Sequence, residues 1–371
     1  MSRVMFIGLD AGGNVPPVLA IAAALRAQRH EVELAGYRDP QLPGIATTSV
    51  EPLGAFEVAR ASSTARVLAR YVHVAVSPAV ERRVGTLIAE RRPDAVVVDC
   101  MMLSAVQAAT RSGVPTTVLF HTFAAFWTGR WARGPVGLAA RLRGLVPAQV
   151  WGRAERRLVA SDQDLDPEPD GGGFDWTGPT EVGAPALPRA AAEPPLVLLS
   201  LSSTWFPGQA DAYRRIIDAL GQLPVRAIVT TGGAQVEGSL RAPSNVQIRG
   251  RAPHEQILPH ASLLIGHGGH STTFKALAHG VPVLVVPMHP LLDQPIVGRA
   301  VADAGVGGLL AKSASSAAIR DAVQDRLADR AMAAAAARMG ERLRSHDGAR
   351  TAAGRIAAAL GPSLRTPDTR L

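Results

Sequence analysis

The stretch "GHGGHSTTFKALAHGVPVLVVPMHPLLDQP", from Gly266 to Pro295, decides how the rest of this sequence is interpreted. It has the pattern of a strand end, a glycine turn, a helix, a second buried strand and a loop that ends in Asp-Gln. Gly268 and Gly269 let a ligand approach the backbone closely. A helix starting near His270–Ser271 presents free N–H groups at the positive end of its dipole, so an anion such as phosphate is expected there.

Polar side chains surround this turn, and each has a structural and a functional interpretation. Ser271 and Thr272 either cap the helix or also donate hydroxyls to phosphate oxygens. His267, beside the phosphate turn, favours donation to an anion over a role as a buried histidine. Asp293 and Gln294 follow the next strand, so they begin a helix or bind ligand hydroxyls at the same sheet edge. A pyrophosphate carrying a sugar would use all of these groups.

The whole chain alternates strand and helix patterns, which is typical of α/β proteins with parallel sheets. One unit begins with the strand at Arg3–Leu9 and a helix at Val15–Gln28, and a second begins at Pro195–Leu201. We expect two Rossmann-like, doubly wound domains facing across a cleft, with residues 1–185 and 195–371 and a linker at about 162–195. Within the first unit, Phe56–Arg92 is expected to be a long helical region. The final helical segment is expected to pack back on the first domain.

Composition fits a soluble globular protein of two domains. The chain has 371 residues, 47% of them hydrophobic, and no apolar run of the roughly 18 residues that a membrane span needs. The interrupted apolar N-terminus predicts a buried strand rather than a signal peptide, so a cytoplasmic location is expected. Cys100 is the only cysteine, which excludes an intramolecular disulfide and a cysteine-rich zinc site.

The positive charge does not indicate a nucleic-acid partner. The net charge is +8, but Lys275 and Lys312 are the only lysines, and the arginines are scattered through alanine-rich helices. No block of basic residues longer than an Arg-Arg pair occurs, so a solvated helical surface is the better explanation. The charge would still help to capture a small anionic ligand.

With these motifs in place, the chain resembles the GT-B glycosyltransferases of family 1, especially the actinobacterial antibiotic and natural-product members. The Gly266–Pro295 stretch resembles their donor-binding signature, and "RAPHEQILPHASLLIGHGG" resembles the block that precedes it. "GGNVPPVLAIAAALRAQRHEV" is similar to the family's opening G-H-V-N-P segment. The C-terminal block is specific, whereas the N-terminal half is only loosely similar.

The resemblance implies inverting sugar transfer from a nucleoside diphosphate donor without a metal or other cofactor. His267, Gly268, Gly269, Ser271 and Thr272 would hold the diphosphate, because preorganised donors stabilise charge on the leaving group. Ser202 and Ser203 would face the phosphates or the sugar, and Asp293 and Gln294 would bind sugar hydroxyls. The family's base-stacking tryptophan corresponds to Arg251, beside Ala252, so the choice between uridine and thymidine stays open.

The catalytic histidine of the family corresponds to Asn14 in this sequence, and an amide cannot act as a general base. Asp99 matches the aspartate that orients that histidine. Asp10 is the first alternative base, with His121 and His73 next, while Asn14 would only position the acceptor. A phenolic oxygen or an electron-rich ring carbon would need less help from a base than an alcohol, so O- and C-transfer both stay open.

A cluster of aromatic residues follows the strand at Thr116–Phe120. It either packs in the core or forms an apolar wall for an aromatic or polyketide acceptor. Its members are Phe120, Phe123, Phe126, Trp127 and Trp131.

The expected function is transfer of a sugar from a UDP- or TDP-sugar to a hydrophobic natural-product aglycone, with no nucleic-acid partner, no membrane span, and a homodimer left open. Two rival functions remain: a nucleotide-sugar epimerase of the same architecture, and a non-catalytic nucleotide-sugar binder or helper protein, for which Asn14 is the evidence.

Overall fold

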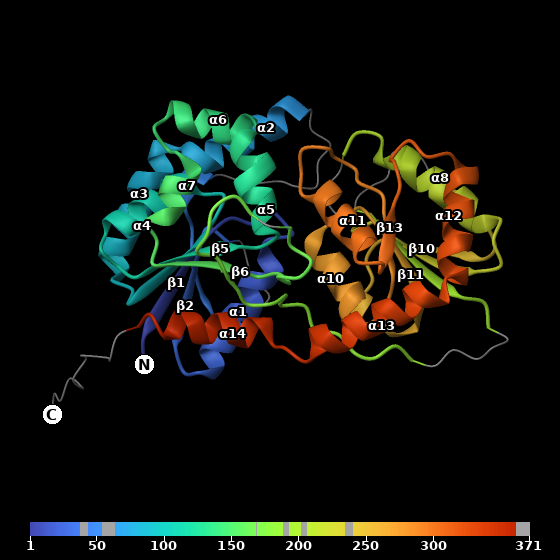
Figure 1. The fold of residues 1–371 in the computed structure, drawn as a ribbon. Helices are drawn as coiled ribbons and strands as arrows, with labels where there is room; N and C mark the ends of the chain where they lie inside the picture. Colours follow the sequence, from blue (N-terminus) through green and yellow to red (C-terminus); the bar gives the residue numbers. More distant parts are fainter. Residues whose placement is uncertain are drawn as a thin grey trace.

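The computed structural model describes residues 1–37, 44–53, 64–167, 169–187, 193–201, 206–233 and 240–360. Two parallel sheets organise them, with helices on both faces (Figure 1). The strands β4 (Ala95–Asp99) and β8 (Leu196–Ser200) are buried along their whole length. Such continuous apolar runs are typical of parallel strands covered on both faces. The predicted pair of doubly wound domains is confirmed.

The first sheet has seven strands in the order β3-β2-β1-β4-β5-β6-β7. The order reverses beside β1, so the loop that follows β1 lies at a topological switch point, where ligands bind in open α/β sheets. The other strands are β1 (Arg3–Ile7), β2 (Glu31–Ala35), β3 (Ala46–Thr48), β5 (Thr116–Phe120), β6 (Arg156–Val159) and β7 (Asp175–Trp176). Helical segments are α1 (Val15–Ala27), η1 (Glu51–Leu53), α2 (Thr64–Val76), α3 (Pro78–Arg91), α4 (Leu103–Arg111), α5 (Ala124–Phe126), the π-helix η2 (Trp127–Trp131), α6 (Pro135–Leu142) and α7 (Pro147–Gly152).

The second sheet has six strands in the order β10-β9-β8-β11-β12-β13, with its switch point beside β8. Its remaining strands are β9 (Arg226–Thr230), β10 (Val246–Arg249), β11 (Ala261–Gly266), β12 (Val283–Val285) and β13 (Gly307–Leu309). Its helices are α8 (Gln209–Gly221), α9 (His254–Ile257), η3 (Leu258–His260), α10 (His270–Ala278), α11 (Gln294–Asp303), α12 (Ser316–Ala328), α13 (Arg330–Arg344) and α14 (Gly348–Ala357).

Two details differ from the predicted elements. The long helical region predicted over Phe56–Arg92 is two helices within the described residues, because Pro78 opens α3 and the hydroxyl of Ser77 accepts a hydrogen bond from Val80 N (3.4 Å). Proline is favoured at this first helical position and cannot continue a preceding helix. The strand β7 lies within the stretch predicted to be linker.

The two domains are joined by more than the linker. Arg342 of α13 donates two hydrogen bonds to Asp162, at 2.6 and 3.0 Å. The last helix, α14, crosses back and packs against α1 of the first domain (Figure 1). Ala352, Ala353 and Ile356 are buried there in the same hydrophobic cluster as residues of β1 and α1. Among the described residues, no helix has the length and apolarity that a membrane crossing requires.

Candidate functional site

A cavity of about 560 Å³ lies between the carboxyl ends of the two sheets. On the C-terminal side, its walls come from the ends of β8, β9 and β11 and from the start of α10. On the N-terminal side they come from the loop after β1. The residues include Gly12, Gly13, Ser200, Thr230, Arg251, Ala252, His254, His267, Gly269, Ser271 and Thr272. We refer to this space as the polar cavity.

The start of α10 presents backbone N–H groups without side-chain caps beside the polar cavity. Gly269 is the N-cap, and no side chain caps the helix, so its first N–H groups are available to a ligand. Gly268 has a φ of +84°, and a Cβ there would lie 2.7 Å from Val285 Cγ1 and 2.8 Å from the Gln294 carbonyl oxygen. Only glycine fits this turn.

The ring of His267 packs on Gly269, where an added Cβ would lie 2.5 Å from His267 Nε2. Burial lowers the pKa of His267 to about 4, and the Ser200 backbone opposes this only in part. The imidazole is therefore neutral at pH 7. Its Nδ1 is buried without a hydrogen-bond partner, which leaves this polar atom for a ligand.

A second cavity, of about 220 Å³, adjoins the first and is lined mainly by apolar side chains. We refer to it as the apolar cavity. Gly13, His267, Gly269 and His270 line both cavities. The remaining walls come from α2, the end of β5, η2, and the loop that precedes α11. They include Asn14, Leu68, Tyr71, His121, Thr122, Phe126, Trp127, Trp131, His289, Asp293 and Gln294.

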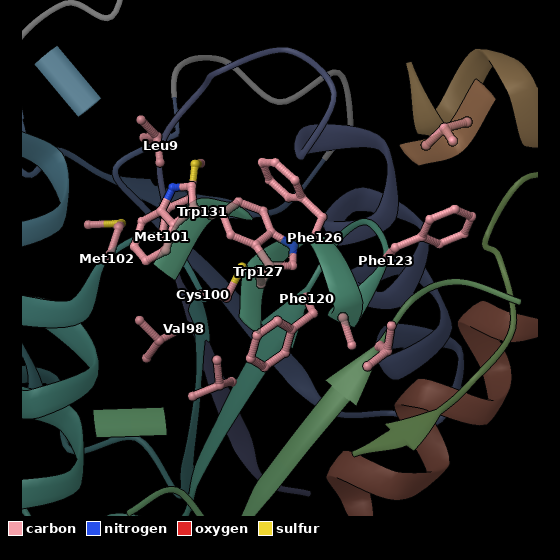
Figure 2. Packing of buried hydrophobic residues seen from close by; sticks show 14 of the residues in the cluster. Leu9, Val98, Cys100, Met101, Met102, Phe120, Phe123, Phe126, Trp127 and Trp131 are labelled. Carbon is pink, nitrogen blue, oxygen red and sulfur yellow. The ribbon is translucent and has the colours of Figure 1, made fainter. Parts of the chain in front are cut away.

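The structure separates the predicted aromatic cluster into wall and core. Phe126, Trp127 and Trp131 line the apolar cavity, with ring centroids 5.0 and 5.4 Å apart along the series (Figure 2). Phe120 is fully buried against Trp151, at 5.2 Å, and lines neither cavity. Phe123 packs on Phe274 of α10 at the domain boundary. The three wall residues lie on or beside the π-turn η2, an irregularity often found at functional sites.

Asp293 and Gln294 reach the apolar cavity from the C-terminal domain. Burial raises the pKa of the Asp293 carboxyl, while the Thr122 hydroxyl and the nearby ring of His121 lower it in part. The Gln294 Oε1 accepts hydrogen bonds from Met288 N (2.7 Å) and His289 N (2.9 Å), so this amide also shapes its loop. The carboxylate thus faces groups of the opposite domain.

In the N-terminal domain, Asp99 connects Asn14 and His121. Its Oδ2 accepts a hydrogen bond from Asn14 Nδ2 (2.8 Å) and lies 3.6 Å from His121 Nδ1. Asp10 and His73, the other two bases considered, line neither cavity, and His73 is exposed on α2. Ser202 and Ser203 lie outside the described residues, but Ser200 and Leu201 before them line the polar cavity.

Asp99, Cys100 and His121 place one potential metal-ligand atom each within 4.8 Å of one another. The chemistry of these donors fits a metal poorly. Both Asp99 oxygens already accept hydrogen bonds, from Asn14 Nδ2 and from Met101 N (2.9 Å). Burial and the Asp99 carboxylate raise the pKa of the Cys100 thiol, whereas a metal binds the thiolate.

Two wall residues that the sequence patterns did not assign to the site are Thr122 and His270. The Thr122 hydroxyl lies beside the Asp293 carboxyl. His270 Nδ1 is buried without a hydrogen-bond partner, as is the indole Nε1 of Trp127. His270 Nε2 contacts Ser161 Oγ at 2.8 Å across the domain boundary. No local sequence signal marks Thr122 or His270, because their roles depend on the opposite domain.

Two family models match the chain. Residues 214–358 match "Erythromycin biosynthesis protein CIII-like, C-terminal domain", and residues 12–167 match "Glycosyl transferase 4-like domain". Demethyllactenocin mycarosyltransferase of Streptomyces fradiae is 35% identical over 31% of this chain and 25% of its own length. The NDP-glycosyltransferase YjiC of Bacillus licheniformis is 32% identical over 46% of this chain and 42% of its own. The chain thus matches less than half the length of these relatives.

Solved structures match over nearly the whole chain. CalG4, the calicheamicin glycosyltransferase, has a TM-score of 0.76 at 21% identity, covering 98% of this chain and 100% of its own. The spinosyn rhamnosyltransferase SpnG, complexed with thymidine diphosphate, has a TM-score of 0.71 at 22% identity, covering 94% and 98%. These likenesses establish the shared two-domain fold.

Proposed function

Because this chain belongs to the GT-B glycosyltransferases of family 1, we propose that it transfers a sugar from a nucleoside diphosphate to a hydrophobic aglycone, with inversion and without a metal. The carrying observation is the common wall of the two cavities, which consists of Gly13, His267, Gly269 and His270. A sugar attached to a diphosphate in the polar cavity would present its anomeric carbon to an acceptor in the apolar one.

The polar cavity suits the nucleoside diphosphate. The uncapped N-terminus of α10, the Ser271 and Thr272 hydroxyls and the unpartnered Nδ1 of His267 offer donors to the phosphate oxygens. As the donor bond breaks, negative charge grows on the leaving diphosphate. Fixed dipoles then stabilise the transition state more than the ground state, which takes over the task that a metal has elsewhere.

The apolar cavity suits an aglycone with a flat ring system. Phe126, Trp127 and Trp131 give it an aromatic wall, and Asp293 brings a carboxylate to the side nearest the donor. The mycarosyltransferase and the calicheamicin glycosyltransferase among the similar proteins are named for natural-product chemistry, which supports an aglycone of that kind. The carboxylate of Asp293 would bind hydroxyls of the transferred sugar.

The test is incubation of the full chain with UDP-glucose or TDP-glucose and a panel of phenolic aglycones, followed by mass spectrometry and NMR. Transfer with a β-linkage from an α-linked donor, unchanged by EDTA, is the expected result. Donor binding by calorimetry without transfer or hydrolysis anywhere in the panel would point to the binder or helper instead. Appearance of an epimerised nucleotide sugar would favour the epimerase.

A further inference from the structure

The carboxylate of Asp99 lies at the end of β4, almost fully buried. Its Oδ1 accepts a hydrogen bond from Met101 N, and its Oδ2 is shared between the Asn14 amide and the His121 ring. A buried carboxylate is costly unless it is compensated by hydrogen bonds or a cation. Asp99 is therefore held in one orientation, with its second oxygen toward the cavity side of the sheet.

Both amide hydrogens of Asn14 already have partners. Its Nδ2 donates to Asp99 Oδ2 and to the Leu9 carbonyl, both at 2.8 Å, and its Oδ1 accepts from Ala11 N at 3.2 Å. The residue is 2% exposed. Asn14 thus fixes the loop after β1 and orients Asp99, and only a lone pair of its Oδ1 is left for an acceptor hydroxyl.

The imidazole of His121 occupies the place where a base is needed. His121 follows β5, whose Leu119 pairs with Asp99 in the neighbouring strand β4. The ring lines the apolar cavity and packs edge-on to Trp127, with centroids 5.1 Å apart. Its Nδ1 lies on the Asp99 side, which leaves Nε2 for a ligand. The 3.6 Å separation is too long for a hydrogen bond, but such contacts often shorten when the substrate binds.

We propose that His121 is the general base of this enzyme and that Asp99 orients it, so that the histidine of the pair lies at the end of β5 instead of in the loop after β1, while the aspartate keeps its place at the end of β4. This rests on the proposed function, and it specifies acceptors that carry a hydroxyl. His121 Nε2 takes the proton of that hydroxyl as its oxygen bonds to the anomeric carbon. The bond from this carbon to the diphosphate breaks, and its electron pair leaves with the nucleoside diphosphate. The imidazolium then returns the proton to water.

Charges around the ring favour this step. The Asp99 carboxylate on β4 and the Asp293 carboxylate before α11 both act on His121, whereas His270 of α10 is neutral because burial lowers its pKa to about 3. Tyr71 of α2 is also neutral, since burial raises its pKa to about 12. The imidazole, which becomes positive in the transition state, thus has the Asp99 carboxylate 3.6 Å from its Nδ1 and two neutral groups near it.

The experiment compares two acceptors in the His121→Ala variant: a phenol that is un-ionised at the assay pH, and a nitrophenol that is already ionised. Loss of a general base is expected to lower kcat for the un-ionised phenol by about 10²–10⁴-fold. The ionised nitrophenol has no proton to remove, so kcat for this acceptor is expected to fall by less than about tenfold. Asp99→Asn is expected to show the same selective loss, smaller in size, while donor Kd stays unchanged in both variants. His73→Ala, at an exposed histidine of α2, is the matched control.

A second experiment places the histidine at position 14 instead of position 121. The double variant Asn14→His, His121→Ala restores the histidine position that the family resemblance implies, beside the same Asp99 oxygen. It is expected to recover at least about tenfold of the lost kcat. Equal losses on both acceptors in His121→Ala would overturn the proposal even if the double variant fails to fold. Absence of transfer by the wild-type protein to any acceptor would instead contradict the proposed function.

Discussion

The two cavities that meet at His267 and Gly269 are built in different ways. The polar cavity takes its anion-binding parts from one turn and the first turn of one helix, within the Gly266–Pro295 stretch. The apolar cavity gathers its wall from the loop after β1, from α2, β5 and η2, and from the opposite domain. Phosphate binding needs only backbone N–H groups in one local geometry, whereas the acceptor space depends on how two domains pack.

The largest effect is expected for Gly269→Val, which changes the turn that forms the polar cavity. Its Cβ would fall 2.5 Å from His267 Nε2, on the wall that both cavities share. We expect kcat/KM to drop by at least about 10³-fold, because a displacement of about 1 Å at the reacting groups already costs about 10²-fold. Donor binding by calorimetry should become undetectable. Gly354→Ala, where an added Cβ meets nothing within 4 Å, is the control. A variant with wild-type donor affinity would contradict the assignment of the turn.

The domain boundary is tested by acid stability at His270. Its pKa in the folded protein is about 3, below the ordinary histidine value of 6.5, so between these values the unfolded chain binds a proton that the folded chain does not. The free energy of unfolding therefore decreases as the pH is lowered, by about 1.4 kcal/mol per pH unit in this range. His270→Gln keeps a hydrogen-bonding side chain toward Ser161 without the titration. Urea unfolding at pH 7 and pH 5 should show a loss about 2 kcal/mol smaller than in the wild type. An identical loss in both proteins would refute a buried, neutral His270.

The apolar cavity, whose wall comes from both domains, is tested by Trp127→Phe. The change keeps most of the aromatic wall but removes the indole N–H, a buried group without a hydrogen-bond partner, from a side chain that lines the apolar cavity. If that group donates to the acceptor, the acceptor KM should rise by about tenfold, the value of one buried hydrogen bond. Donor Kd should not change. A rise in donor Kd with no change in acceptor KM would show that the two cavities have been assigned the wrong way round.

The smallest effect is expected at Arg251, on the rim of the polar cavity. A guanidinium stacked on a nucleotide base contributes about 0.5–1 kcal/mol at an exposed site, so Arg251→Ala should weaken donor binding by about two- to fivefold. Calorimetry with UDP-glucose and TDP-glucose measures this. Arg249→Ala, an exposed arginine nearby on β10, serves as the comparison. Equal effects of both changes would indicate general charge attraction rather than stacking.

Sequence patterns predicted the fold and the glycine turn before α10 because both depend on short-range rules. Buried β-branched runs such as β4 mark parallel strands, and paired glycines mark a tight turn into a helix. The acceptor side was predictable only in part. Phe120 and Trp127 stand seven residues apart with similar chemistry, yet Phe120 lines neither cavity and Trp127 lines one, because Phe120 ends the buried strand β5 whereas Trp127 begins the π-turn η2. The internal hydrogen bonds of Asn14 likewise could not be derived from its position in a motif.

The return of α14 to the first domain imposes an order on synthesis. Ala352, Ala353 and Ile356 complete the hydrophobic cluster that contains Val4 and Ile21, so β1 and α1 wait for a segment some 330 residues later. The first domain cannot bury its full core until α14 has been synthesised. A truncation before Gly348 would therefore expose apolar surface in the first domain, on β1 and α1.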